Sequence, residues 1–279
     1  MIDCILDALL DTLKIIPYLL IAFILLELIE HKLSKKNEKL LTNNKYSVVI
    51  GSILGGIPQC GFSTIAANLF SSRVITLGTL IAIFLSTSDE MLPIMISEKV
   101  SIFLILKIIG FKIIIGMIAG LIIDIFYNKK NTKIKNNIHD MCDHEHCHCK
   151  EDGIFISSIK HTLKISFFIL IANLTIGLSI YFIGEDNISN LLLSKNILTY
   201  FISSLIGLIP NCASSVIITK LYLSKLITIG NLLSGLLTGS GLGILLLFKT
   251  NKNLKENLTI LGIIYLIGVT IGLIVDIIL

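Results

Sequence analysis

The chain has 279 residues, of which 54% are apolar and only 15% charged, and its formal net charge is +4. A soluble domain carries about 25% charged residues. This composition, with a mean hydropathy of +0.89, excludes an ordinary soluble domain and indicates a polytopic membrane protein. The lysines lie between apolar stretches and not on one face, so the positive charge reports membrane topology and excludes nucleic acid as a partner. The acidic start of the chain lacks the basic region of a signal peptide, which predicts that the first apolar segment is retained.

The apolar stretches predict the same order of helices in each half of the chain. A first helix over 13–30 precedes a lysine-rich loop, and an apolar stretch over 48–70 is interrupted by proline and glycine. Two long spans follow, over 74–96 and 102–126. A polar linker over 128–152 separates this half from a second half with the same order. We therefore predict a first membrane repeat at 1–127, a His/Cys-rich linker at 128–156 and a second membrane repeat at 157–279.

A motif around a proline and a cysteine appears twice, at a fixed offset of 152 residues. Gly56-Ile57-Pro58-Gln59-Cys60 returns as Gly207-Leu208-Ile209-Pro210-Asn211-Cys212. Further matches at the same offset are Thr76-Leu77-Gly78 with Thr228-Ile229-Gly230, and Asp124 with Asp276. A repeat that keeps its register over this length predicts a duplicated half, which is how transporters with broken helices are built.

The number of crossings in each half decides how the halves are related. If each Pro-X-Cys stretch crosses the membrane once, each half has four spans and the halves are parallel. If it enters and leaves on one side, the number is odd and the second half is inverted. Only the odd number places Arg73, the basic loops and the linker on one side, as the positive-inside rule requires, with Lys220 and Lys225 as exceptions. We therefore predict an all-α membrane fold of two inverted-topology repeats. Each has three full spans and a Pro-broken pair of short helices, about ten helices in all, with the linker cytosolic and both termini outside.

The two helix breaks are predicted to form a transport site. Proline removes a backbone donor, and the freed carbonyls must be satisfied by protein, water or an ion. An amide residue, a cysteine and small hydroxyl residues follow each proline, so each break gathers oxygen and sulfur ligands. The alternative is a proline kink beside an inert cysteine. The candidate residues at the two breaks are Pro58, Gln59, Cys60, Ser63, Pro210, Asn211, Cys212, Ser214 and Ser215.

Two acidic residues in the third span of the first half have no acidic counterpart in the second. Asp89 and Glu90 join the candidate transport site, because charges within a span mark ion paths or proton relays. The alternative is an acidic helix end near the interface. Lys112, in the middle of the next span, is the predicted charge partner of these acids when no cation is bound, and a purely structural ion pair is its alternative role. Asp124 and Asp276 lie at span ends, where a structural role is expected.

The linker concentrates metal ligands. Imidazole and thiolate together suit zinc, copper and other borderline or soft ions, although the spacing is not that of a zinc finger. We predict a flexible metal collector or sensor, and the alternative is adventitious binding by a solvated loop. The seven candidate metal ligands are His139, Cys142, His144, His146, Cys147, His148 and Cys149.

These motifs resemble the ten-helix heavy-metal exporter family of bacteria, whose members are variously called arsenic efflux proteins or manganese transporters. The resemblance covers nearly the whole chain, and it implies a multi-pass permease of the bacterial plasma membrane for a metal or metalloid. It also adds Asn68 to the candidate transport site. The residues that carry it are Pro58-Gln59-Cys60-Gly61-Phe62-Ser63, Ala67-Asn68-Leu69, Thr87-Ser88-Asp89-Glu90 with Pro93, Pro210-Asn211-Cys212, and His146-Cys147-His148-Cys149.

The leading hypothesis is a secondary exporter of a metal or metalloid ion, coupled to protons through Asp89 or Glu90. The sequence shows no Walker-type phosphate loop and no pattern of catalytic residues, and we expect neither enzyme activity nor a tightly bound cofactor. Thiols as ligands favour zinc or arsenite, whereas amide and carboxylate oxygens favour manganese, and the sequence offers both. The alternatives are a permease for an organic or anionic solute, or a non-transporting metal sensor. The oligomeric state stays open.

Overall fold

The structure is a computed structural model. It describes residues 44–57, 60–88, 91–128 and 197–278, with scattered residues between 9 and 24 and between 159 and 175. Within these residues all regular structure is α-helical. In the described part of the chain, three helical stretches are long and apolar enough to cross a membrane, namely Ile102–Phe126, Ile229–Thr250 and Leu254–Ile278. The predicted all-α membrane fold is confirmed, while most of the first helix of each half and the linker from residue 129 on lie outside the described residues.

The two halves contain matching helices. The first half has α3 (Asn44–Gly55), α4 (Cys60–Ser71), α5 (Leu77–Ser86), α6 (Met91–Ser97) and α7 (Ile102–Asn128). The second half has α11 (Leu198–Gly207), α12 (Cys212–Leu223), α13 (Ile229–Thr238), α14 (Leu242–Thr250) and α15 (Leu254–Ile278). The helices α4 and α12 begin at the same offset as α5 and α13, so the sequence repeat is also a repeat of structure.

Local sequence signals recur at equivalent positions of the two halves. Thr76 and Thr228 are the N-caps of α5 and α13, and their side chains accept hydrogen bonds from the backbone amides of Thr79 and Asn231. The turns before these caps contain Arg73 and Lys225, with left-handed φ values of 59° and 60°. The duplicated sequence thus specifies duplicated turns as well as duplicated helices.

The prediction of a continuous helix over 74–96 is wrong. The segment is divided into α5 and α6, and its counterpart is divided into α13 and α14. In the second half Gly241 has φ 54° and ψ −140°, a conformation that glycine adopts far more readily than other residues. In the first half Thr87 leaves the helix with ψ 130°. The interruptions are short, so a hydropathy profile does not register them.

The helices α3 and α4 form a hairpin that enters and leaves at one end of the molecule. Ideal Cβ atoms at Gly51 and Gly55 would touch Thr79 and Ser86 in turn, so α3 runs alongside α5 in the same direction. At the end of α4, Ser71 bonds to Thr250 at the end of α14. We call this end, where α4 terminates and α15 begins, the Arg73 end, and the opposite one the Lys225 end.

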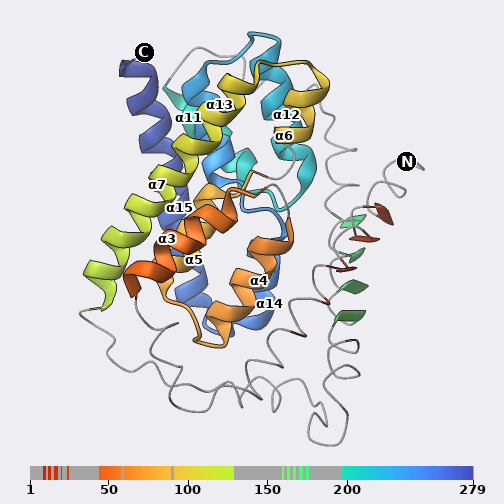
Figure 1. The fold of residues 1–279 in the computed structure, drawn as a ribbon, viewed down its shortest axis with the longest axis vertical. Helices are drawn as coiled ribbons and strands as arrows, with labels where there is room; N and C mark the ends of the chain where they lie inside the picture. The colour runs from red at the N-terminus through yellow and green to blue at the C-terminus, as the bar shows by residue number, and fades with distance from the viewer. Residues whose placement is uncertain are drawn as a thin grey trace, which may run out of the picture.

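The second half is inverted relative to the first. The amide of Gly78 at the start of α5 donates to Asp124 at the end of α7, and the hydroxyl of Tyr200 at the start of α11 donates to Asp276 at the end of α15. Figure 1 shows that α7 and α15 run in opposite directions, with the α3–α4 hairpin and the α11–α12 hairpin in opposite halves of the molecule. This arrangement confirms the odd number of crossings predicted from the lysines.

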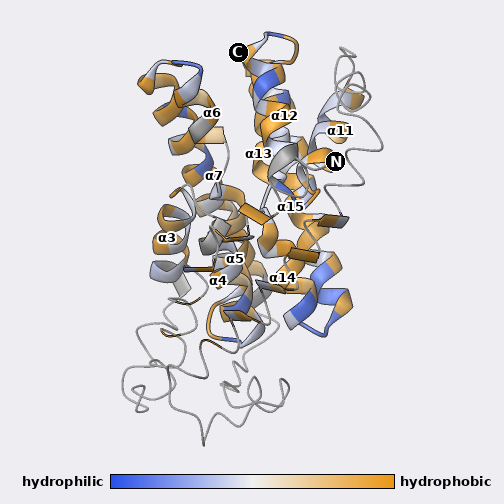
Figure 2. Ribbon diagram, turned by 90° about the vertical axis from the view of Figure 1, so that its right-hand side faces the viewer, coloured by the Kyte–Doolittle hydropathy of each residue, from blue (hydrophilic) through white to orange (hydrophobic). Residues whose placement is uncertain are grey.

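Both repeats contribute to the core, and the outer surface of the bundle is also apolar. One buried cluster joins Phe70 and Phe84 of the first repeat to Leu246 and Ile264 of the second. Large apolar side chains remain exposed along α7 and α15, including Phe103 at 80%. In Figure 2, where the ribbon is coloured by hydropathy, most of the helical ribbon has the orange of hydrophobic residues. Such a continuous exposed apolar surface is expected of a helix bundle in lipid.

Candidate functional site

The two broken crossings meet end to end in the middle of the molecule. The helix α5 starts at the Arg73 end and α13 at the Lys225 end, and both stop near the centre (Figure 1). The last carbonyls of a helix have no partner within it and carry the negative end of the helix dipole. Two such ends, one from each repeat, therefore create a region that favours positive charge. We call this region the central junction.

A buried lysine lies between these two helix ends. The side chain of Lys112, from the middle of α7, has 0% exposure. Its ammonium donates one hydrogen bond to the carbonyl oxygen of Thr87, just beyond α5. It donates another, of 2.8 Å, to the carbonyl oxygen of Leu236 in the last turn of α13. The sequence indicates Lys112 as a site residue, but not these backbone acceptors.

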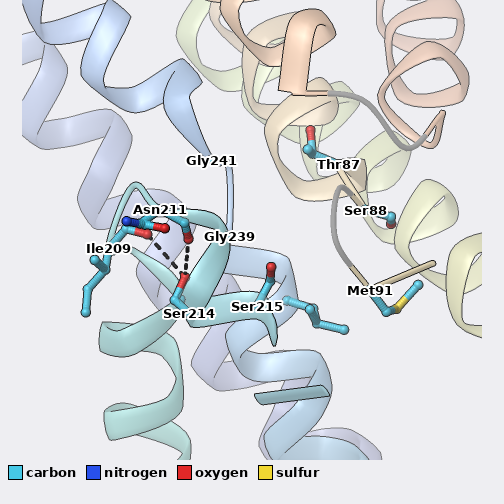
Figure 3. Close-up of a pocket in the computed structure, with 11 residues that line it drawn as sticks. Thr87, Ser88, Met91, Ile209, Asn211, Ser214, Ser215, Gly239 and Gly241 are labelled. Atoms are coloured by element: carbon cyan, nitrogen blue, oxygen red, sulfur yellow. Dashed lines mark hydrogen bonds between the residues drawn. The ribbon is translucent and has the colours of Figure 1, made fainter. Parts of the chain in front are cut away.

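A small pocket opens beside the central junction. It has a volume of about 20 Å³, enough for one water molecule or one ion. Thr87, Ser88 and Met91 line it from the first repeat, and Asn211 and Ser215 line it from the second, where Gly239 and Gly241 complete the wall. Figure 3 shows Thr87 and Ser88 on one side of this space and Asn211, Ser214 and Ser215 on the other. The lining offers hydroxyl, amide and carbonyl oxygens.

The tip of the α11–α12 hairpin shapes one wall of the pocket. Ser214 donates to the carbonyl oxygen of Asn211 at 2.8 Å and lies 3.3 Å from that of Ile209 (Figure 3). Both carbonyls also accept a backbone amide, that of Asn211 at Ile209 and that of Ser214 at Asn211, so the hydroxyl adds a further donor to the turn around Pro210. Of the predicted site residues, Asn211, Ser214 and Ser215 come together here, next to Pro210 in the turn.

The corresponding residues of the first repeat are placed differently or lie outside the described residues. Cys60 and Cys212 are the first residues of α4 and α12, and the structure does not describe their side chains. Ser63 is fully buried against α14, where a Cβ at Gly243 would lie 2.8 Å from the Cβ of Ser63. The predicted site residues outside the described part of the chain are Pro58, Gln59, Asp89 and Glu90, together with all seven linker ligands from His139 to Cys149.

Asn68 is a polar side chain in an apolar setting. It lies on α4 with 0% exposure, and among the described residues neither its amide nitrogen nor its carbonyl oxygen has a hydrogen-bond partner. A buried, unsatisfied amide costs free energy, about 1–3 kcal/mol. Asn68 is not among the residues that line the pocket of the central junction.

Asp124 and Asp276 are helix-end residues, as expected from their positions. Asp124 accepts hydrogen bonds from the Gly78 amide at 2.8 Å and the Thr76 hydroxyl at 2.7 Å. Asp276 accepts from the Gly230 amide at 2.8 Å and also from the Thr228 hydroxyl. Each carboxylate compensates the positive end of the helix that it caps.

Sequence reasoning missed the backbone part of the site. Thr238-Gly239-Ser240-Gly241 aligns with Ser86-Thr87-Ser88-Asp89 and departs from it in composition, yet the two segments are matching helix breaks. The signal is present in the sequence, because two glycines two residues apart inside an apolar span indicate a break. Among the described residues, no three His, Cys, Asp or Glu side chains lie close enough to hold a metal ion.

An inverted repeat, broken crossings and a charged group buried at their junction together define a membrane transporter. A family model described as "Putative, 10TM heavy-metal exporter" matches residues 1–186. The chain belongs to this family. No curated protein and no solved structure matches the chain.

Proposed function

We propose that the chain is a secondary transporter that exports a metal or metalloid ion from the cytosol and binds it at the central junction. The observation that carries this proposal is the place of the Lys112 ammonium, between the C-terminal carbonyls of Thr87 and Leu236. A position that stabilises a buried ammonium also attracts a metal cation, because both are held by the same carbonyl oxygens and dipole ends.

The ligands around the junction bear on the choice of cargo. The pocket supplies neutral oxygens from Ser88, Asn211 and Ser215. Asp89 and Glu90, which stand between Ser88 and Met91 in the sequence, would add carboxylates, and this combination suits manganese. Cys60 and Cys212 begin the helices of the two hairpin tips and would add thiolates, which suit zinc or arsenite. We propose that a cargo of either kind binds across the two repeats.

We further propose that cargo and protons compete at the junction. A divalent ion and a buried ammonium repel one another strongly in a medium of low dielectric constant. Cargo entry would therefore require Lys112 to move away or to lose its proton, and Asp89 or Glu90 would hold the proton in the other half of the cycle. Export is thereby linked to a proton gradient.

The pocket size supports an ion as cargo. A volume of about 20 Å³ accepts one dehydrated ion or one water molecule. Pockets for organic ligands are larger by an order of magnitude, about 300–1,000 Å³. The linker residues His139–Cys149 would deliver metal to the Arg73 end, which we assign to the cytosol because Lys249, Lys252 and Lys255 lie there together with Arg73.

The test is ion flux in sealed proteoliposomes containing the purified protein. Manganese, zinc and arsenite are offered one at a time, with and without a pH gradient. We expect saturable flux of one of these ions, increased by the gradient, with Asp89→Asn abolishing the effect of the gradient. Equal flux of every ion, or flux identical to that of protein-free liposomes, would contradict the proposal.

A further inference from the structure

Two pseudo-equivalent helix contacts of the inverted repeat are in different states. The hairpin helix α4 packs on α14, and its counterpart α12 faces α6. In the first contact Ser63, Gly243 and Phe84 are packed without space, since a Cβ at Gly243 would lie 2.8 Å from Ser63 and 2.9 Å from Phe84. The residues at the matching positions of the second contact are Ser215, Met91 and Leu236, and all three line the pocket. The same contact is thus closed on one side and hollow on the other.

The closed contact is fastened by polar groups at the Arg73 end. The guanidinium of Arg73, in the turn after α4, donates two hydrogen bonds of 2.8 and 2.7 Å to the carboxylate of Glu256 in the first turn of α15. The amide nitrogen of Asn251 donates to the same carboxylate at 2.9 Å. Ser71 and Thr250 are joined by a hydrogen bond of 2.6 Å between their hydroxyls. The bonds of Arg73 and Ser71 tie the first repeat to the second, and the bond of Asn251 lies within the second repeat and holds the Glu256 carboxylate.

The sequence does not repeat this fastening at the Lys225 end. The offset that relates the two halves pairs Arg73 with Lys225, so a basic residue is kept in an equivalent turn. It pairs Glu256 with Leu104, which cannot accept a hydrogen bond through its side chain. It pairs Ser71 with Leu223 and Thr250 with Glu98, so the bond between the two hydroxyls is not repeated either. The two ends of the molecule are therefore fastened unequally.

We infer that Arg73 and Glu256 form the gate of the transport cycle at the Arg73 end, and that the structure shows the state in which this gate is closed. The opposite state arises when α12 closes on α6 and α4 separates from α14, because the two repeats can exchange their conformations. The bidentate pair must break in that step. Glu256 has 9% side-chain exposure and Arg73 has 41%, so the pair is only partly screened by solvent. The inequality of the two ends makes the closed Arg73 gate the resting state.

This inference rests on the proposed transport function for its purpose, but its test needs no knowledge of the cargo. The hairpin tips carry the native residues Cys60 and Cys212, which serve as reporters. Sealed vesicles of both orientations are treated with a membrane-impermeant maleimide, and labelling of each cysteine is measured by peptide mass spectrometry. The linker cysteines report which side is which. In the wild type we expect Cys212 to be labelled from the side opposite the linker and Cys60 to be protected.

Two variants should shift the molecule toward the opposite state. Glu256→Gln keeps the shape of the side chain and its bond to Asn251 but removes the charge pair. We expect labelling of Cys60 from the linker side to increase about tenfold and that of Cys212 to fall. Leu104→Glu places a carboxylate where the repeat lacks one, opposite Lys225, and should change both signals in the same direction. Lys255→Gln, the removal of a solvated charge beside Glu256, should change neither.

Equal labelling of both tips in the wild type would overturn the inference, as would a Glu256→Gln variant with wild-type labelling. The same holds if Lys255→Gln has the effect expected of Glu256→Gln, because the effect would then be one of net charge. Failure of the metal-flux experiment would leave the labelling result intact, so the two proposals fail separately. Thermal unfolding of each variant in detergent identifies any variant that does not fold. If Leu104→Glu does not fold, the labelling of Glu256→Gln alone still tests the inference.

Discussion

The ammonium of Lys112 lies 2.8 Å from the carbonyl oxygen of Leu236, so a helix of the first repeat is hydrogen-bonded to the broken crossing of the second. The position equivalent to Lys112 in α15 is Ile264, which is fully buried in the core. The duplicated scaffold therefore supplies two helix ends, but only one ammonium. The pseudo-symmetry is broken at the point where the charge is.

Replacing Lys112 with methionine should abolish transport without preventing assembly. Methionine has a side chain of similar length to lysine but without the ammonium. The carbonyls of Thr87 and Leu236 therefore lose their shared donor. We expect the flux of the preferred ion in proteoliposomes to fall at least tenfold, a loss equivalent to about 1.4 kcal/mol. Lys107→Met, an exposed position on the same helix, is the control and should retain its flux. A Lys112→Met protein with wild-type flux and an unchanged response to the pH gradient would remove Lys112 from the mechanism.

Substituting alanine at Gly78 should destabilise the protein, because no space exists for a side chain there. A Cβ at this position would collide with the carbonyl oxygen of Gly120, where α5 and α7 are in contact. The two helices must separate, which we expect to cost about 1–3 kcal/mol. Thermal unfolding in detergent measures the change. Gly110→Ala is the matched control, since a Cβ at Gly110 would have no neighbour within 4 Å, and it should be neutral or stabilising.

Removing the negative charge from a helix cap should weaken one repeat at a time. Asp124→Asn loses one charge-assisted bond to the Gly78 amide or the Thr76 hydroxyl, and Asp276→Asn loses its equivalent. Each variant should lose about 1 kcal/mol of stability, with a lower unfolding temperature and an unchanged apparent affinity for the ion. A change in ion affinity without a change in stability would place these carboxylates in the transport path.

The sequence predicted the duplication and the inversion, and it named Asn211, Ser214 and Ser215, which line the pocket, because those features are recorded in side chains. Thr76 and Gly78 recur as Thr228 and Gly230, which indicates that two helices start in the same way. The distribution of lysines indicates on which side of the membrane each loop lies. The positions of Thr87 and Leu236 at the junction could not be predicted in this way. Thr87 and Leu236 bind Lys112 through their backbone carbonyls, and every residue has such a carbonyl. These two can be identified as ligands only from the structure, where the two helix ends meet.

The choice between thiol and oxygen ligands can be made by substitution at the hairpin tips. If the cargo is zinc or arsenite, Cys60→Ser and Cys212→Ser should each lower the tolerance of a host that lacks its own exporters, because serine binds soft ions poorly. If the cargo is manganese, both variants should retain tolerance and Asn211→Leu should lose it. Growth across a concentration series of each ion measures the outcome. Full tolerance to every ion in all three variants would exclude the tips from cargo binding.

Deleting the seven linker ligands tests whether the linker delivers metal. Replacing His139–Cys149 by a Gly/Ser segment of equal length should leave flux at saturating metal unchanged and lower it at limiting metal, since a collector acts on local concentration. Flux lost at every concentration would indicate a part in the transport step itself.

The central claim is that the cargo ion binds at the junction of the two repeats, and equilibrium binding tests it most directly. Binding of manganese and zinc is measured on purified protein in which the linker ligands are replaced by serine, so that only the membrane part contributes. We predict saturable binding of about one ion per chain, weakened at least tenfold by Asn211→Leu combined with Ser215→Ala, and unchanged by Lys107→Met. The absence of binding after the linker is removed, or binding that survives the double substitution, would contradict the account.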